Sequence, residues 1–425
     1  MSNYIVIADD LTGALDTAVQ FVSVGVAARV LRYEPELVDT MFDSGVGDGG
    51  GSSVTVFDTA SRHLSADRAA ERVKQVVIGA REAVTRDGGD GPKFYKKTDS
   101  ALRGNVGSEL SALLSASEAD LICFVPAHPH LGRTTVNGVQ MVNGRPLAES
   151  EFARDTRDPV AVSAVARILA QQTPVPTQLV TTTEVHRGEP LHRLPRRVVI
   201  CDAETPDDLH AIADWMTRQN VRYELAGCGG FAGRISRIWK LDRANAAAGR
   251  SGGAALSDSP ASDPPAEVNE VASRGMLLVC GSMHPRSREQ ARYALESGVF
   301  TRDRTVGACF SVVVSGEESG ADPDAIAQRL AEVALRQMRA HPPGALTVFG
   351  GDTAGAVLDA LEVRTILPVY EFATGVVVSV IDSGVLPETR LLVSKAGGFG
   401  GEELAMEMYR EFESLVARGI QCGLR

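Results

Sequence analysis

The feature that most constrains the fold occurs three times in the last third of the chain. A short apolar run ends in a turn of small residues, and a helical pattern follows, in segments 276–282, 346–353 and 391–401. Each segment predicts a buried strand that leads into a helix, where unpaired N–H groups and the positive helix dipole favour an anion. One such turn usually only relieves a tight bend, but three together indicate a nucleotide site.

Strand-then-helix alternation also runs through the first half of the chain. Residues 4–8 predict a buried strand, residues 9–13 a turn, and residues 14–22 an amphipathic helix. Further predicted strands lie at 54–57, 93–95, 121–125, 178–181 and 198–201. This alternation predicts an α/β protein with mainly parallel sheets flanked by helices.

The length of 425 residues favours two domains over a single core. Residues 244–274 are rich in small and polar residues and almost lack large apolar side chains, so they cannot bury enough surface to offset the entropy of ordering. We therefore expect an α/β domain over 1–243, a flexible linker or loop over 244–274, and a second α/β domain over 275–425.

Charge and cysteine content limit the class of protein. The 43 basic and 54 acidic residues give a net charge of −11, which argues against nucleic-acid or anionic-membrane partners and favours a small-molecule ligand. The start lacks the basic region of a signal peptide, and no apolar stretch is long enough to cross a bilayer, so we expect a cytoplasmic protein. The six scattered cysteines predict buried, reduced thiols.

Charged residues gather where the predicted strands of the first domain end. They are Asp9 and Asp10 after the first strand, Arg62 after the strand at 54–57, and Lys96, Lys97, Asp99 and Arg103 after the strand at 93–95. In a parallel sheet these positions share the carboxyl edge, where ligands of open α/β sheets bind. Arg and Lys there can hold a carboxylate, while Asp and Ser can hydrogen-bond hydroxyls. The pattern predicts a site for a small polyhydroxylated anion.

Each of these residues also has a purely structural interpretation. Asp9–Asp10 and Asp99–Ser100 suit helix caps, and Lys96–Lys97 suit a solvated face. The shared placement at strand ends nevertheless favours function for Asp10, Lys97, Asp99 and Arg103, and less strongly for Arg62.

The segment 125–135 is another strand end followed by a turn, from which Arg133 could reach the same edge. His128 and His130 could share a metal, but no third ligand is in register and their spacing suits no usual zinc loop. The metal ligands therefore stay unassigned.

The glycine turns carry groups suited to phosphate. Ser282 and Thr353 could donate hydroxyl groups to a phosphate, and Lys395 could supply a positive charge. The pairs Gly350–Gly351 and Gly397–Gly398 would let the backbone approach the phosphate closely. Asp352 suits a helix cap as well as a nucleotide loop. Neither a Walker A motif nor G-x-G-x-x-G occurs, so a P-loop NTPase and a dinucleotide-binding Rossmann fold are not supported.

Seven runs of the sequence resemble the four-carbon acid sugar kinase family. They are IADDLTGALDTAVQF, FDTASR, YKKTDSALRGNVGSEL, FVPAHPHLGRTTVNGVQMVNGRPLAESEFARD, CGSMHPRSREQ, VFGGDTAGAVL and VSKAGGFG. The resemblance extends to about Leu404 and leaves out the stretch at 244–273. KKTDSALRGN and PAHPHLGRTTVNG are its most specific parts.

The resemblance implies an ATP-dependent kinase that phosphorylates the terminal (C4) hydroxyl of a sugar acid such as D-threonate, D-erythronate or 3-oxotetronate. It implies an amino-terminal domain for the acid, a carboxy-terminal domain for ATP, and reaction in the cleft between them. The substrate contacts it implies are Asp9, Asp10, Arg62, Lys97, Thr98, Asp99, Ser100 and Arg103. The nucleotide contacts it implies are Ser282, Gly350, Gly351, Asp352, Thr353, Gly397 and Gly398.

Two positions depart from the family pattern. His128 stands where the family commonly has Phe, and residues 373–377 replace a Pro-Gly-Val-Pro turn. The GGDTA form resembles the threonate and erythronate kinases more than the 3-oxotetronate kinases. D-threonate or D-erythronate is therefore the expected substrate, with 3-oxotetronate as the alternative.

We hypothesise that Arg62, Lys97 and Arg103 anchor the acid, that Asp10 accepts or orients the hydroxyl proton, and that Asp99 is the alternative catalytic carboxylate. Mg²⁺ is expected to bridge the ATP phosphates, because alignment and charge neutralisation dominate phosphoryl transfer. The rivals are a non-catalytic sugar-acid or nucleotide sensor, for which no output module is visible, and an aldolase or dehydrogenase, whose sequence signatures are missing. A homodimer is compatible with this interpretation.

Overall fold

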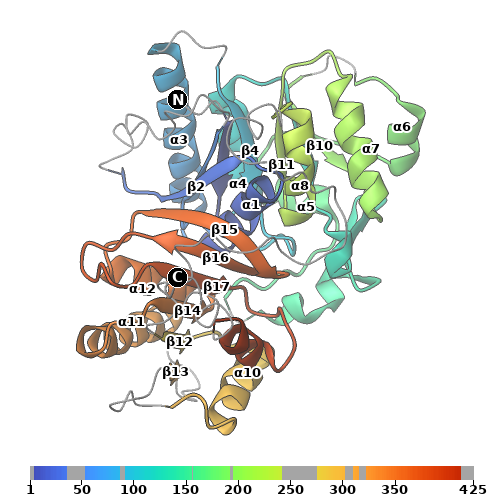
Figure 1. Ribbon diagram of the computed structural model, residues 1–425. Helices are drawn as coiled ribbons and strands as arrows, with labels where there is room; N and C mark the ends of the chain where they lie inside the picture. Colours follow the sequence, from blue (N-terminus) through green and yellow to red (C-terminus); the bar gives the residue numbers. More distant parts are fainter. Residues whose placement is uncertain are drawn as a thin grey trace, which may run out of the picture. The chain divides into compact units, whose positions relative to one another are not determined.

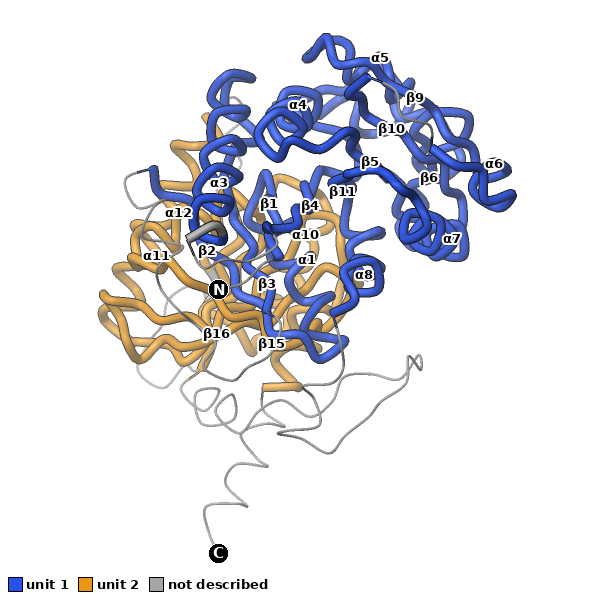
Figure 2. The backbone as a smooth tube through the Cα atoms, turned by 90° about the horizontal axis from the view of Figure 1, so that it is seen from above, with its two compact units in different colours: residues 1–251 blue, residues 252–425 orange. Residues whose placement is uncertain are grey.

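The computed structural model describes residues 4–35, 53–86, 91–155, 157–191, 195–241, 275–301, 310–314 and 322–412. The chain divides into two compact units, residues 1–251 and 252–425 (Figures 1 and 2). The predicted linker at 244–274 lies outside the described residues, so the domain limits drawn from it stay predictions.

Unit 1 is built on a parallel sheet with the strand order β2-β3-β1-β4-β11-β5-β10-β9. Its strands are β1 (Tyr4–Ala8), β2 (Ala27–Arg32), β3 (Ser53–Asp58), β4 (Lys93–Lys97), β5 (Leu121–Val125), β9 (Thr177–Val180), β10 (Arg197–Cys201) and β11 (Tyr223–Gly227). All the strands predicted in this half are therefore confirmed, with β1 and β5 at the predicted limits. Sequence patterns missed β2 and β11.

Helices cover both faces of this sheet, which explains why strands such as β1 and β5 are apolar along their length. They are α1 (Leu11–Ser23), α3 (Ala66–Arg86), α4 (Val106–Ser117), α5 (Val165–Ala170), α6 (Thr182–Arg187), α7 (Pro206–Thr217) and α8 (Gly229–Ile238). Ile5 and Ile7 pack in one core cluster with residues of α3, α4 and α5. Helix α8 contacts both α1 and α7. The predicted turn at 9–13 is shorter than expected, because α1 already begins at Leu11.

A small antiparallel sheet follows β5. It consists of β6 (Arg133–Val136), β7 (Val139–Val142) and β8 (Arg145–Pro146), with short 3₁₀ helices at Pro129–Leu131, Leu147–Glu149 and Glu151–Arg154. These segments place Arg133 and Phe152 beyond the carboxyl end of β5.

Unit 2 contains the three glycine turns. Its strand order is β13-β12-β14-β17-β16-β15, parallel from β13 to β17 and antiparallel in the remaining pairs. The strands are β12 (Met276–Cys280), β13 (Phe310–Val314), β14 (Ala345–Phe349), β15 (Thr365–Ala373), β16 (Val376–Ile381) and β17 (Leu391–Lys395), and the helices are α10 (Pro285–Glu296), α11 (Pro323–Ala340), α12 (Gly351–Ala360) and a helical segment at 404–412.

The three predicted apolar runs are β12, β14 and β17, and they are direct neighbours in the sheet. Because parallel neighbours end at the same edge, their turns gather at one place. The β15–β16 hairpin was not predicted; its turn contains Gly375 at φ +71°, a conformation that favours glycine.

Two other expectations concern cysteines and membranes. Cys123, Cys201, Cys228 and Cys280 are buried free thiols, as predicted, whereas Cys309 and Cys422 lie outside the described residues. Among the helices that the structure describes, none combines the length and apolar character needed to span a bilayer.

Candidate active site

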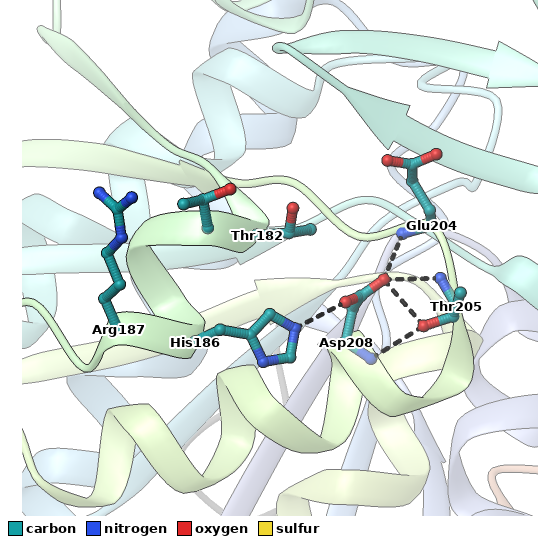
Figure 3. A pocket seen from close by; sticks show the side chains of 7 residues that line it. Thr182, His186, Arg187, Glu204, Thr205 and Asp208 are labelled. Carbon is teal, nitrogen blue, oxygen red and sulfur yellow. Dashed lines mark hydrogen bonds and ion pairs between the residues drawn. The ribbon is translucent and has the colours of Figure 1, made fainter.

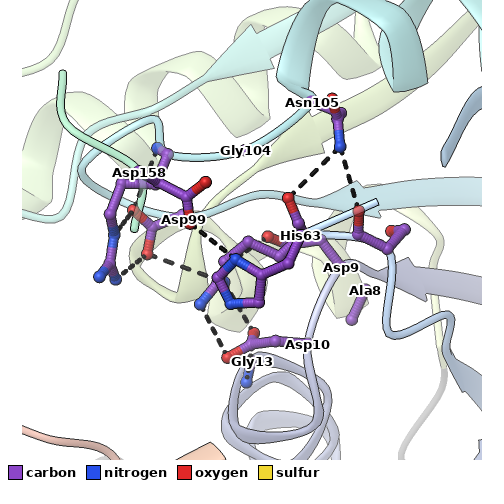
Figure 4. A network of polar contacts seen from close by, with 12 residues as sticks. Ala8, Asp9, Asp10, Gly13, His63, Asp99, Gly104, Asn105 and Asp158 are labelled. Atoms are coloured by element: carbon purple, nitrogen blue, oxygen red, sulfur yellow. Dashed lines mark hydrogen bonds and ion pairs between the residues drawn. The ribbon is translucent and has the colours of Figure 1, made fainter. Parts of the chain in front are cut away.

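Arg62 lies among carboxylates at the carboxyl ends of β1, β3 and β4. Three of these carboxylates, Asp9, Asp10 and Asp99, are labelled in Figure 4. Its Nε donates to Asp9 Oδ2 at 2.7 Å, and its two terminal nitrogens lie 3.0 and 2.9 Å from Asp10 Oδ2 and Oδ1. Asp99 Oδ1 is 3.8 Å from Nη2. The structure thus brings Asp9, Asp10, Arg62 and Asp99 together, as their positions at strand ends predicted.

Asp10 has three partners in the structure, the first of which is Thr12, whose Oγ1 donates to Oδ2 at 2.5 Å. Asp10 is the N-cap of α1, accepting a hydrogen bond from Gly13 N at 3.0 Å, and it forms the bidentate pair with Arg62. Burial raises the pKa of Asp10, but Arg62 and Lys97 oppose this, and the net pKa lies below its ordinary value. The side chain is therefore an ionised acceptor at neutral pH.

Asp99 is held by Arg103 and by backbone N–H groups of its own turn. Its carboxylate accepts from Arg103 Nε and Nη2, both at 2.9 Å, and from the backbone of Ala101 and Arg103. Arg103 also pairs with Asp155 at 2.9 Å. Burial opposes ionisation of Asp99, yet Arg103 and Arg62 hold its pKa well below the usual range. Asp99 is consequently better suited to fixing Arg103 than to accepting a proton.

Lys96 and Lys97 are the last two residues of β4 and are buried, so the interpretation as solvated charges is wrong. Lys97 is only 5% exposed. No ion pair or hydrogen bond to its ammonium group is found among the described residues. Because a buried charge without a partner is costly, this ammonium group is suited to receive an anion.

Gly13 leaves room for both Lys97 and Asp10. A Cβ atom at this position would lie 2.5 Å from Asp10 Oδ1 and 2.6 Å from Lys97 Nζ. The glycine therefore brings the helix start, the carboxylate and the ammonium group close together.

Lys96 forms a buried ion pair that the sequence did not reveal. Its Nζ lies 3.1 Å from Glu109 Oε2 and donates to the backbone oxygen of Lys97 at 2.8 Å. Glu109 also accepts from Ser61, which contacts Thr59, whose hydroxyl donates to Ala8 O. This network joins the ends of β1, β3 and β4 beneath the cluster. The spacing of Lys96 and Glu109 carries no local signal that they pair.

Polar atoms without partners remain next to the cluster. Asp9 Oδ1 and Thr98 Oγ1 are buried and have no hydrogen-bond partner within the described chain. Ser100 contributes its backbone oxygen, which accepts from Gln140. Thr98 and Ser100 thus continue the Lys97–Asp99 segment along the carboxyl edge.

A second group of side chains lies around Phe152, in the segment after β5. The guanidinium groups of Arg103 and Arg133 lie 5.3 and 5.2 Å from the ring centre of Phe152. His63 Nδ1 pairs with Asp158 at 2.8 Å (Figure 4). The described residues contain no group of three or more His, Cys, Asp or Glu side chains suited to a metal, and His128 and His130 form part of no such group. Phe152, Asp155 and Asp158 were not singled out by the sequence patterns.

In unit 2 the site is made largely of backbone. Gly281 N and Ser282 N both donate to Phe349 O, at 3.2 and 3.1 Å, and Gly350 N donates to Lys395 O at 3.2 Å. Gly350 has φ +109°, which favours glycine, and a Cβ there would lie 3.2 Å from Ser282 N. These contacts hold the turns after β12, β14 and β17 against one another.

Helix α12 begins directly at this junction. Its N-cap is Gly350, which has no side chain to satisfy the first N–H groups. Asp352 is not the cap, so the capping interpretation is wrong; it lies exposed in the first turn. Gly351 is the first helical residue, and Thr353 is buried with its hydroxyl against Gly281.

The loop after β17 packs against the loop after β12. A Cβ at Gly397 would lie 3.5 Å from Ser282 Oγ, and one at Gly398 would lie 3.1 Å from His284 Nε2. Lys395 instead turns inward, donating at 2.8 Å to Ser287 Oγ and Gly397 O. Burial lowers the pKa of Lys395 to about 8. In the structure Lys395 holds the glycine loop, and the positive charge that it was predicted to supply to phosphate stays a prediction.

A separate open pocket lies at the ends of β9 and β10 and contains none of the predicted site residues (Figure 3). It is lined by Thr182, Thr183, His186, Arg187, Glu204, Thr205 and Asp208. Asp208 accepts from the backbone of Thr205 and Glu204 and pairs with His186. These contacts cap the N-terminus of α7, so the pocket is polar because its residues form a helix cap.

Comparison with known proteins identifies the family. Residues 4–235 match the model of a sugar-binding N-terminal domain, and residues 312–405 match that of a nucleotide-binding C-terminal domain. The chain is 31% identical to a D-threonate kinase of Bordetella bronchiseptica, over 94% of this chain and 95% of that protein. The chain belongs to the four-carbon acid sugar kinase family. It is therefore an enzyme of the sugar-acid kinase class.

Other members of the family differ in their named substrate. A D-threonate kinase of Salmonella typhimurium is 30% identical, over 94% of this chain and 95% of that protein. A 3-oxo-tetronate kinase of Methylobacterium radiotolerans is 26% identical, over 93% of this chain and 96% of that protein. A solved protein from Salmonella typhimurium LT2 shares the fold, with a TM-score of 0.70 over 96% of this chain and 99% of that chain at 18% identity.

Proposed function

We propose that this kinase transfers the γ-phosphate of ATP to the terminal (C4) hydroxyl of D-threonate or D-erythronate. Sequence identity supports this choice, because two relatives named D-threonate kinase match at 31% and 30% over nearly the whole chain, against 26% for a 3-oxo-tetronate kinase. The 3-oxo acid remains the alternative substrate, because it keeps the same carboxylate and terminal hydroxyl.

One observation carries the proposal, namely the buried ammonium group of Lys97 next to the ionised Asp10. Lys97 has no acidic partner within ion-pair distance in the described chain, and both groups approach the space beside Gly13. A bound carboxylate would neutralise Lys97, while Asp10 would accept a hydrogen bond from a hydroxyl of the same molecule. A small hydroxylated acid meets both requirements.

Asp10 is the proposed catalytic carboxylate, and Asp99 is the alternative. Phosphoryl transfer has a loose transition state, so orienting the attacking hydroxyl matters more than strong basicity. The lowered pKa of Asp10 fits this role, because the group stays ionised and accepts a hydrogen bond throughout the neutral range. Both carboxylates already accept several hydrogen bonds, so the choice of Asp10 rests on its position beside the buried ammonium group of Lys97.

Arg62 and Arg103 act mainly as positioning residues in this proposal. The sequence hypothesis made them direct anchors of the acid, but both are already bonded to carboxylates of the protein. Arg62 fixes Asp9 and Asp10, and Arg103 fixes Asp99. Asp9, Thr98 and Ser100 are proposed to contact hydroxyls of the substrate, since Asp9 Oδ1 and Thr98 Oγ1 have no hydrogen-bond partner in the described segments.

The glycine loops of unit 2 are proposed to bind the ATP phosphates. The uncapped start of α12 offers the N–H groups of Gly351, Asp352 and Thr353, and Gly350, Gly397 and Gly398 keep the surface free of side chains. Ser282 adds a hydroxyl. Water competes with the sugar acid as acceptor, so exclusion of water is expected to accompany substrate binding.

Mg²⁺ fits this donor set. The described residues contain no multi-ligand protein cage, and a magnesium ion is commonly held by phosphate oxygens, water and one carboxylate. Exposed Asp352 in the first turn of α12 is the carboxylate we propose. The ion would supply neutralisation of charge on the transferred phosphoryl group.

The test is ADP formation by the purified protein with Mg-ATP and a panel of D-threonate, D-erythronate, their L isomers and 3-oxotetronate. We expect the highest kcat/KM with D-threonate or D-erythronate and a phosphate monoester at C4 of the product. If 3-oxotetronate gave the highest activity, the proposed substrate would change and the proposed reaction would stay the same. ATP turnover that no acid stimulates would overturn the proposal. Location of the reaction between the two domains, the cytoplasmic location and a homodimeric state stay predictions.

A further inference from the structure

The cations at the carboxyl edge of unit 1 fall into two classes. Arg62 and Arg103 are bonded to carboxylates at 2.7–3.0 Å, whereas Lys97 and Arg133 have no ion pair within the part of the chain that the structure describes. The Nε atom of Arg133 is buried and lacks a hydrogen-bond partner. An N–H group that has lost its water without gaining an acceptor carries an unmet hydrogen bond.

Backbone and ring contacts hold Arg133 in place. His128 N donates to Arg133 O at 2.7 Å, and Arg133 N donates back to His128 O at 3.1 Å. Its guanidinium group lies over the ring of Phe152, 5.2 Å from the centre. Stacking on the ring leaves the plane of the guanidinium group open to an acceptor, and Nε has none among the described residues. In-plane N–H groups are the ones that bind carboxylates bidentately.

Lys97 and Arg133 also act on the same neighbours. Burial, with further repulsion from Arg133 and then Lys97, lowers the pKa of His128 to about 3. Both cations also oppose the burial that raises the pKa of the Cys228 thiol to about 11. His128 is thus neutral near pH 7 and Cys228 is a neutral thiol, so neither compensates the two positive charges. Asp10, whose carboxylate lies beside Lys97 next to Gly13, is already paired with Arg62.

We propose that Arg133 and Lys97 together bind the carboxylate of the substrate. This inference rests on the proposed function and adds the orientation of the acid. The strand order β1-β4-β11-β5 places Asp10 after β1, Lys97 at the end of β4 and Arg133 beyond β5. Adjacent strands lie roughly 4.8 Å apart, so these positions follow one another along the edge over roughly 14 Å. The carboxylate therefore points toward β5 and the reacting hydroxyl toward Asp10.

The decisive variant is Arg133→Met, which keeps an unbranched side chain over Phe152 and removes the charge. We expect the KM for the acid to rise ~10- to 100-fold, because a charged hydrogen-bonded contact is lost, while the KM for ATP stays the same. Arg133→Lys should recover part of the loss. Arg145→Met is the matched control, because Arg145 lies exposed on β8 of the same small sheet.

A neutral ligand shows whether Arg133 binds the carboxylate of the substrate or only packs against Phe152. The polyol in which CH₂OH replaces the carboxylate should bind wild type weakly, and Arg133→Met should leave its dissociation constant, measured by calorimetry, within about twofold. An equal loss for acid and polyol, or an unchanged KM for the acid, would overturn the inference. Should Arg133→Met lack a cooperative melting transition, Arg133→Gln replaces it under the same criteria. Failure of the proposed function looks different, because wild type would then form no ADP with any acid.

Discussion

The two candidate sites of this kinase are formed by different chemical groups. In unit 1 the site consists of charged side chains, with Arg62 paired to Asp9 and Asp10 and with Lys97 buried beside them. In unit 2 it consists of glycine-rich backbone around Gly350 and Gly397. Both follow the carboxyl ends of parallel strands, so the topology is shared while the chemistry is not.

The difference matches what each site has to distinguish. Side chains can place a donor or acceptor opposite each hydroxyl, which a short chiral acid requires. Backbone N–H groups offer a repeated donor that suits any phosphate. Substitutions in unit 1 should therefore change the use of the acid, and substitutions in unit 2 the use of ATP.

Asp10→Asn should give the largest effect. Asparagine keeps the helix cap, so α1 remains stable, but the negative acceptor for the hydroxyl is lost. We expect kcat to fall ~10²- to 10⁴-fold with little change in ATP affinity. An assay of ADP formation measures kcat, and calorimetry measures the affinity for ATP. A kcat equal to that of wild type would remove Asp10 from the chemistry.

Gly397→Leu should produce the opposite pattern. A Cβ there already reaches ordinary contact with Ser282 and His284, so a larger side chain fills the proposed phosphate surface. Overpacking of about 1–3 kcal/mol corresponds to a roughly 5- to 150-fold weaker ATP affinity. Gly401→Leu is the control, because a Cβ at 401 meets no atom within 4 Å. Equal weakening of acid and ATP binding would contradict the division of labour.

Gly13→Ala tests the closeness of Asp10 and Lys97. The added Cβ would lie within 2.6 Å of both groups, and their flexible ends can move away, so the fold should survive while the site is distorted. We expect kcat/KM for the acid to fall ~10-fold or more, since small misplacements are costly in catalysis. In Gly233→Ala, where only Gln20 Oε1 lies near at 3.5 Å, activity should be unchanged and the melting temperature equal or higher.

His128→Gln should give the smallest effect, visible only in the pH dependence of stability. The pKa of His128 is about 3 in the fold and 6.5 ordinarily, so the unfolded chain takes up a proton below pH 6.5 that the folded protein does not. Wild type should therefore lose up to about 1.4 kcal/mol per pH unit between pH 6.5 and 3, a loss absent in the variant.

The measurement is the urea midpoint of both proteins at pH 7.5 and 5.5. Asp10 and Asp99 also have lowered pKa values, but their contribution is lost only at more acidic pH and is common to both proteins. A difference in unfolding free energy between wild type and variant that does not change with pH would show that His128 is not held neutral by the fold.

Much of this fold is visible in local sequence patterns. Apolar runs of strand length marked β1 and β5 at their observed limits, and the same signal found β12, β14 and β17. Such runs can be recognised in the sequence because strands buried on both faces are apolar along most of their length. The runs of β2 and β11 were missed because charged residues interrupt their apolar pattern, whereas the β15–β16 hairpin was missed although β16 is an apolar run of strand length.

The sequence by itself determined which residues follow the strands, and therefore that Asp10, Lys97 and Asp99 share one edge. Only the tertiary structure decided which charges neutralise one another. Arg62 and Arg103 are paired with carboxylates, Lys96 is paired with Glu109, and Lys97 and Arg133 have no such partner among the residues that the structure describes. The reason is physical: the position of a strand end is encoded locally, whereas ion pairing depends on the order of strands in the sheet and on burial. Both arise from contacts between segments far apart in the chain.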